Sequence, residues 1–64
     1  MKSYAEAQSL QRVLQRMAGT VDNGITVEVG KRKGEWQFHI RDKWGGDWWE
    51  ENWRKVRDFF WTGY

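Results

Sequence analysis

The stretch that decides the fold is ITVEVGKRKGEWQFHIR, residues 25–41. Apolar and polar residues alternate on both sides of its basic, glycine-flanked centre, and a period of two is typical of strands with one buried face. The pattern predicts an antiparallel hairpin in which Val27 lies opposite Phe38, joined by a turn over residues 31–34. The polar face of this hairpin would carry Thr26, Glu28, Gln37, His39 and Arg41.

The residues before the hairpin predict a helix from about Tyr4 to Ala18. Ser3 and Glu6 have the spacing of a capping box, which satisfies backbone amides of the first turn, and Gly19 is the expected stop. One face carries an apolar stripe at helical spacing, made of Leu10, Val13, Leu14 and Met17. The opposite face carries Gln8, Arg12, Gln15 and Arg16.

After the hairpin, the segment KWGGDWWEENW at residues 43–53 holds four of the six tryptophans of the chain. Asp47 and Glu50 repeat the capping-box spacing and predict that a second helix begins there. The apolar stripe of this helix would pack on the hairpin, and it consists of Trp49, Trp53, Val56 and Phe60.

These elements predict a single α+β domain over residues 1–64, with the order α-β-β-α and two helices packed on one face of a two-stranded antiparallel hairpin. A lone hairpin leaves both edges free, so a homodimer through the hairpin edge, with a four-stranded sheet, is an alternative. The element order is similar to that of a double-stranded-RNA-binding domain. The third strand and the basic start of the second helix of that family are missing from the predicted elements, so no residue role is transferred.

The sequence offers little for catalysis or for a metal. There is no cysteine, and the only histidine, His39, falls on the polar face of a strand, away from the serines of the first helix. Asp47, Glu50 and Glu51 are explained by helix capping and by i, i+4 ion pairs. One histidine and a few carboxylates fall short of a structural zinc pattern. We therefore expect no enzyme activity, no metal and no cofactor.

The location follows from two further features of the sequence. No apolar run is long enough to cross a membrane, and the residues MKSYAEAQSLQ at the N-terminus lack the apolar core of a signal peptide. The expected location is the cytoplasm, with no membrane partner.

Two groups of residues are candidates for binding. Trp48 and Phe59 lie on a second stripe of the predicted helix and Trp44 lies outside it, so these three would form an exposed or half-exposed aromatic surface. Tryptophan is a residue type that dominates protein interfaces. The second group is basic and would meet phosphates: Lys31, Arg32 and Lys33 at the turn, with Arg12 and Arg16 on the first helix. A solvated turn that discourages edge pairing explains the same charges.

Charge favours a protein partner over a nucleic acid. The net charge is only +2, and the tryptophans are accompanied by acids that would repel phosphates: Asp42, Asp47, Glu50 and Glu51. We therefore expect a small, tryptophan-rich, non-catalytic binding protein that inhibits or regulates a protein partner, by analogy with those encoded by phages or mobile elements. The alternative is a nucleic-acid-binding accessory protein that uses the basic turn and the first-helix arginines.

Overall fold

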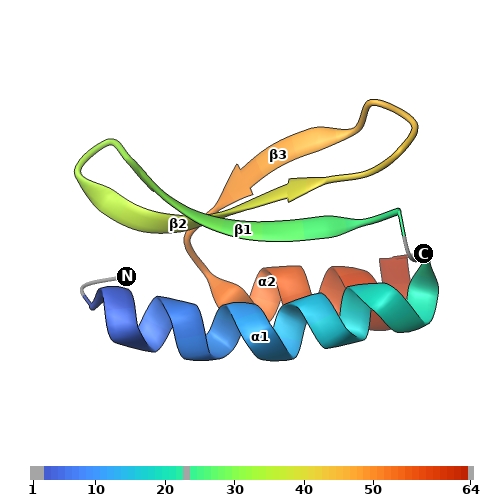
Figure 1. Cartoon of the computed structure of the whole chain (residues 1–64), viewed down its shortest axis with the longest axis horizontal. Helices are drawn as coiled ribbons and strands as arrows, with labels where there is room; N and C mark the ends of the chain where they lie inside the picture. The colour runs from blue at the N-terminus through green and yellow to red at the C-terminus, as the bar shows by residue number, and fades with distance from the viewer. Residues whose placement is uncertain (1–2, 23, 64) are drawn as a thin grey trace.

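The computed structural model describes residues 3–22 and 24–63, with the exception of the side chains of residues 62 and 63. The described elements are α1 (Tyr4–Val21), β1 (Thr26–Arg32), β2 (Glu35–Arg41), β3 (Asp47–Glu50) and α2 (Trp53–Asp58), followed by the π-helical turn η1 (Phe59–Gly63). These strands form one antiparallel sheet in the order β1-β2-β3. Both helices lie on one face of the sheet and the other face is open (Figure 1). The α+β class and the antiparallel hairpin are confirmed, whereas the expected two-stranded sheet is wrong, because a third strand makes the order α-β-β-β-α.

The helix α1 begins where the sequence predicts and ends later. The hydroxyl of Ser3 accepts a hydrogen bond from the N–H of Glu6, with 3.3 Å between the two atoms. The helix continues through Gly19 to Val21 and is closed by Asp22. The expectation that Gly19 stops the helix is wrong, since a glycine inside a helix costs only about 1 kcal/mol relative to alanine and Asp22 supplies the cap.

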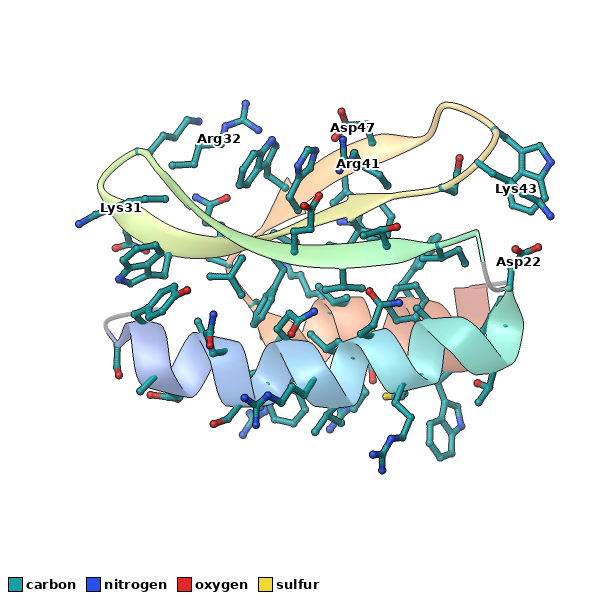
Figure 2. All side chains as sticks on the ribbon, viewed as in Figure 1. Asp22, Lys31, Arg32, Arg41, Lys43 and Asp47 are labelled. Carbon is teal, nitrogen blue, oxygen red and sulfur yellow. The ribbon has the colours of Figure 1, made fainter. Side chains whose placement is uncertain are left out.

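Asp22 also anchors the chain that follows α1. Its N–H donates to the carbonyl of Ala18 at 2.9 Å, and its carboxylate accepts from the N–H of Gly24 at 2.7 Å. The ammonium of Lys43 lies 3.3 Å from the same carboxylate, at the end of the molecule where the chain passes from β2 to β3 (Figure 2). The hydrogen bond from Gly24, followed by the contact with Lys43, lowers the pKa of Asp22.

The hairpin of β1 and β2 is tighter than the sequence pattern suggests. Its turn consists of Lys33 and Gly34, both with positive φ, at 55° and 79°, which is the geometry of a two-residue type I′ turn. The register therefore shifts by two residues, so that Val27 lies opposite Ile40 instead of Phe38. Because side chains alternate with a period of two, the shift keeps every residue on its predicted face.

The third strand occupies residues 47–50, where the sequence predicts the first turn of a helix. The carboxylate of Asp42 accepts hydrogen bonds from the N–H groups of Trp44 and Gly46, at 2.8 and 2.7 Å, and closes a tight turn. This turn brings residues 47–50 beside the free edge of β2, with Asp47 opposite Arg41. The second helix instead begins after Asn52, whose side chain accepts from the N–H of Arg54 at 3.0 Å.

The core lies between the helices and the sheet. Its most buried large side chains come from all of these layers: Leu14, Ile25, Val27, Phe38, Ile40 and Val56. Trp48 and Trp53 are half-buried and pack against this cluster. The expectation that Trp49 and Val13 belong to the core is wrong, because alternation along β3 turns Trp49 to the open face and α1 leaves Val13 exposed at 53%.

Candidate functional site

The structure separates the three aromatic residues that the sequence groups together. Trp48 faces the helices, and its ring meets that of Phe59 edge to face, with 4.6 Å between the ring centroids. Both side chains are half-buried against the core. Trp44 lies in the turn between β2 and β3, is 65% exposed, and has the Lys43 ammonium 4.9 Å from its ring. Trp48 and Phe59 thus form one unit, and Trp44 belongs to a different part of the surface.

The basic residues also fall on two separate surfaces. Lys31 and Arg32 lie at the hairpin end of the sheet (Figure 2), where each cation sits 5.3 Å from a tryptophan ring, Trp36 and Trp49 respectively. Arg12 and Arg16 lie exposed on α1, in the other layer of the fold. The hairpin turn and the α1 arginines therefore do not form one continuous basic patch.

The open face of the sheet is occupied by contacts among its own side chains. The rings of His39 and Trp49 stack in parallel, 4.2 Å apart, and Arg32 lies over the Trp49 ring. The Nε2 atom of His39 contacts the Asp47 carboxylate, and an ion pair joins Glu28 to Arg41. These pairs link β3 and β1 to the central strand β2. In the part of the chain that the structure describes, no group of three or more histidine and carboxylate side chains could hold a metal ion.

A concave surface lies between the helical elements α1 and η1. It is a groove of about 450 Å³. Its walls are formed by Val13, Arg16, Met17 and Thr20 of α1 and by Phe60 and Trp61 of η1. Trp61 is 78% exposed, and together with Arg57 and Asp58 it also lines a smaller hollow of about 290 Å³. Trp61 thus contributes to both hollows.

Sequence reasoning missed this groove for an identifiable reason. The apolar stripe of α1 was expected to be buried along its whole width, whereas Leu14 is fully buried and Val13 is not. Trp61 lies outside both predicted stripes of the second helix, which was a usable signal of exposure. The turn η1 is π-helical, a geometry that changes the direction of side chains relative to an α-helix and is frequent at functional sites.

The outer face of the helices is predominantly basic. Between Ala7 and Val21 the helix α1 contains Arg12 and Arg16 and no acidic residue. The exposed side chains of α2 add Arg54 and Lys55. Asp58 at the end of α2 is an exposed acid, and it accepts two hydrogen bonds of 3.1 Å from Arg57. The groove is therefore lined mostly by apolar side chains, and Arg16 in its lining together with Arg12, one turn earlier on α1, gives it a positively charged rim.

Comparison with known proteins gives no further direction. No family model, no curated protein and no solved structure shows a significant match to this chain. Among the described residues, no helix has both the length and the apolar composition needed to cross a membrane. The functional argument therefore rests on the surfaces themselves.

Proposed function

We propose that this protein is a small, non-catalytic binding protein of the cytoplasm that engages and regulates a protein partner through the groove between α1 and η1. One observation carries the proposal: Trp61 is 78% exposed beside an apolar groove of about 450 Å³. Large exposed apolar surfaces on small proteins mark interaction sites, and tryptophan is enriched among the residues that dominate binding energy.

The other tryptophan rings discussed above have side-chain contacts of their own, which supports the choice of Trp61 as the binding residue. The exposed Trp44 has a lysine over its ring, and Trp49 lies between His39 and Arg32. The predicted partner contacts of Trp44, Trp48 and Phe59 remain part of the proposal, with Trp44 as a separate contact. Trp48 and Phe59 pack against the core next to Phe60, whose ring is 5.8 Å from that of Phe59. They are therefore linked to the groove through Phe60, which lines it.

Photo-crosslinking tests the proposal at the level of a single surface. A photoreactive p-benzoylphenylalanine replaces Val13 on the groove wall, and in a control protein it replaces Thr26 on the exposed face of β1. In an extract of the cells that carry the gene, the Val13 probe should form a discrete adduct with one protein, and Trp61→Ala should abolish it. Equal labelling from both positions, or labelling that survives Trp61→Ala, would refute the groove as the binding surface.

Nucleic-acid binding is the second candidate, and the position of α2 favours it. The helix α2 begins at Trp53, so its first turn contains Arg54 and Lys55. The sequence-based elements lacked two features of the double-stranded-RNA-binding order, a third strand and a basic start of the second helix. The structure contains a third strand, and its second helix starts with cations. Glu51, just before α2, lies beside Glu35 at the start of β2, although in Figure 1 the hairpin turn is at the left end of the sheet and α2 starts nearer the middle.

Acids close to both groups of cations weaken this second candidate. Glu35 follows the basic turn by one residue, and Glu50 and Glu51 precede α2, so these carboxylates would repel phosphates. A complex with about four phosphate contacts should lose roughly 3.5 logarithmic units of affinity per tenfold rise in salt. Replacing Lys31, Arg32 and Lys33 together with serine should reduce that slope. The absence of any affinity for RNA or DNA would reject the candidate, and an affinity that is insensitive to salt and to this change would reject the basic turn as the binding site.

A further inference from the structure

We infer that the groove between α1 and η1 binds an amphipathic helix of the partner protein, with apolar residues on one side of that helix and acidic residues along its edges. This inference rests on the proposed function and specifies the chemistry of the occupant. It depends on the spacing of the residues along the α1 wall of the groove and on the charges at the rim.

The spacing of the α1 wall matches a helical occupant. Val13, Met17 and Thr20 stand at positions i, i+4 and i+7 of α1, so they form one row along the helix with a side chain at each turn. A second helix that lies along this row presents its own side chains with the same repeat, and such helix-in-groove binding uses anchors at i, i+3, i+4 and i+7. Phe60 and Trp61 form the opposite wall.

The positive charges at the rim indicate that the bound helix carries negatively charged side chains. Arg16 lines the groove, and Arg12 precedes it by one helical turn on the exposed surface of α1. Neither arginine forms an ion pair with an acid in the described part of the chain. An occupant with glutamate or aspartate beside its apolar stripe would supply partners for both, whereas a basic amphipathic helix would place like charges together.

The experiment uses two designed helical peptides as probes and the full-length protein. Both peptides carry leucine at i, i+3, i+4 and i+7, and the flanking positions are glutamate in one and lysine in the other. Titrations are followed by the indole N–H resonances of the protein in NMR spectra. The glutamate peptide should shift the Trp61 resonance and bind about tenfold more tightly than the lysine peptide, as expected for two exposed ion pairs at the rim.

A charge reversal provides the decisive control. Arg12→Glu combined with Arg16→Glu should reverse the preference, so that the lysine peptide binds more tightly, and Trp61→Ala should weaken both peptides. These substitutions are at exposed positions, and circular dichroism checks that each variant is folded. Equal affinity for the two peptides, no binding of either, or a preference unchanged by the reversal would overturn the inference. So would self-association of the wild type that buries Trp61, since a second copy would then be the occupant.

The outcomes separate this inference from the proposed function. If the Val13 photoprobe still captures a protein in a Trp61-dependent manner while neither peptide binds, the groove binds a partner but the amphipathic-helix assignment is wrong. If the glutamate peptide binds as expected but the photoprobe captures no protein from the extract, the groove chemistry holds and the regulatory role fails.

Discussion

The side-chain oxygen of Gln15 accepts a hydrogen bond from the backbone N–H of Val27, with 2.8 Å between the two atoms. The amide nitrogen of the same side chain donates to the carbonyl of Ile25 at 3.0 Å. Gln11 adds a bond of 2.7 Å to the carbonyl of Val27. The helix α1 therefore occupies part of the outer edge of β1, much as another strand would. A homodimer through this edge would have to break these bonds.

Removing the Gln15 amide should destabilise the protein. Gln15→Met leaves a backbone N–H and a carbonyl of β1 without partners in a half-buried setting, which costs about 1–3 kcal/mol. Chemical denaturation measures the change in the free energy of unfolding. The control is Gln8→Met on the exposed side of α1, expected within about 0.5 kcal/mol of wild type. Equal effects at both positions would contradict the role of Gln15 at the edge.

The close contact of Gly30 with Trp49 is a second point of sensitivity. A Cβ atom at residue 30 would lie 2.8 Å from Cη2 of Trp49, whose ring stacks on His39. Gly30→Ala should therefore displace the indole and cost about 1–3 kcal/mol, as in other overpacked sites. In a Trp49→Ala background the cost should largely disappear, and a double-mutant cycle measures this coupling. Additive effects of the two changes would show that the contact does not limit residue 30.

At Gly19, in contrast to Gly30, an added Cβ should stabilise the protein. Gly19 lies inside α1, and, apart from its chain neighbours and the backbone of the same helix, no atom of the described residues lies within 4 Å of the position that an added Cβ would take. Gly19→Ala should raise the free energy of unfolding by about 0.5–1 kcal/mol, because alanine restricts the unfolded chain and favours helix. A higher thermal midpoint in calorimetry would confirm the expectation. Destabilisation would instead indicate that the helix ends at residue 19, as the sequence pattern suggests.

Trp48 and Trp44 should respond differently to truncation. Trp48→Ala removes a half-buried ring that packs on Phe59 and the core, so we expect a loss of about 2–3 kcal/mol, below the cost for a fully buried tryptophan. Trp44 is 65% exposed, and Trp44→Ala should stay within about 0.5 kcal/mol of wild type. The matched pair of urea titrations checks this order of effects, and the reverse order would refute the placement of β3.

The contact between Glu51 and Glu35 makes the stability of the protein depend on pH through the carboxyl group of Glu51. The nearby Glu35 side chain raises the pKa of Glu51 above its ordinary value of 4.5, because a protonated Glu51 can share a hydrogen bond with it. Because the pKa of Glu51 is raised in the folded state, the stabilisation by protonated Glu51 is fully present below its unfolded-state pKa. This stabilisation is lost as the pH rises through its folded-state pKa. Glu35→Gln should therefore raise the thermal midpoint at neutral pH and lose this advantage below pH 4.5.

A second acid serves as the control for this pH dependence. Glu28 accepts a hydrogen bond from Arg41 on the open face of the sheet. Glu28→Gln removes an exposed ion pair, which contributes little, so it should give no increase in thermal midpoint at neutral pH. Identical pH profiles for the two variants would argue against a specific effect between Glu35 and Glu51.

Only part of the candidate groove could be predicted from the sequence. Its basic rim follows from the positions of Arg12 and Arg16 on a predicted helix, and these were identified. Its apolar lining was not, because Val13 belongs to the same helical stripe as Leu14 and the pattern cannot show where burial stops. The width of the stripe that is covered depends on where α2 and η1 pack, and that is decided by residues more than thirty positions away along the chain.

The sequence by itself determined the two faces of the β1–β2 hairpin and the start of α1, because alternation and capping act between residues that are close along the chain. Only the tertiary structure decided the state of residues 47–50. The spacing of Asp47 and Glu50 suits a helix start, and the same residues suit a strand. The free edge of β2 supplied hydrogen-bonding partners that select the strand. This choice turned Trp49 to the open face and Trp48 toward the core, since a strand sends neighbouring side chains to opposite sides.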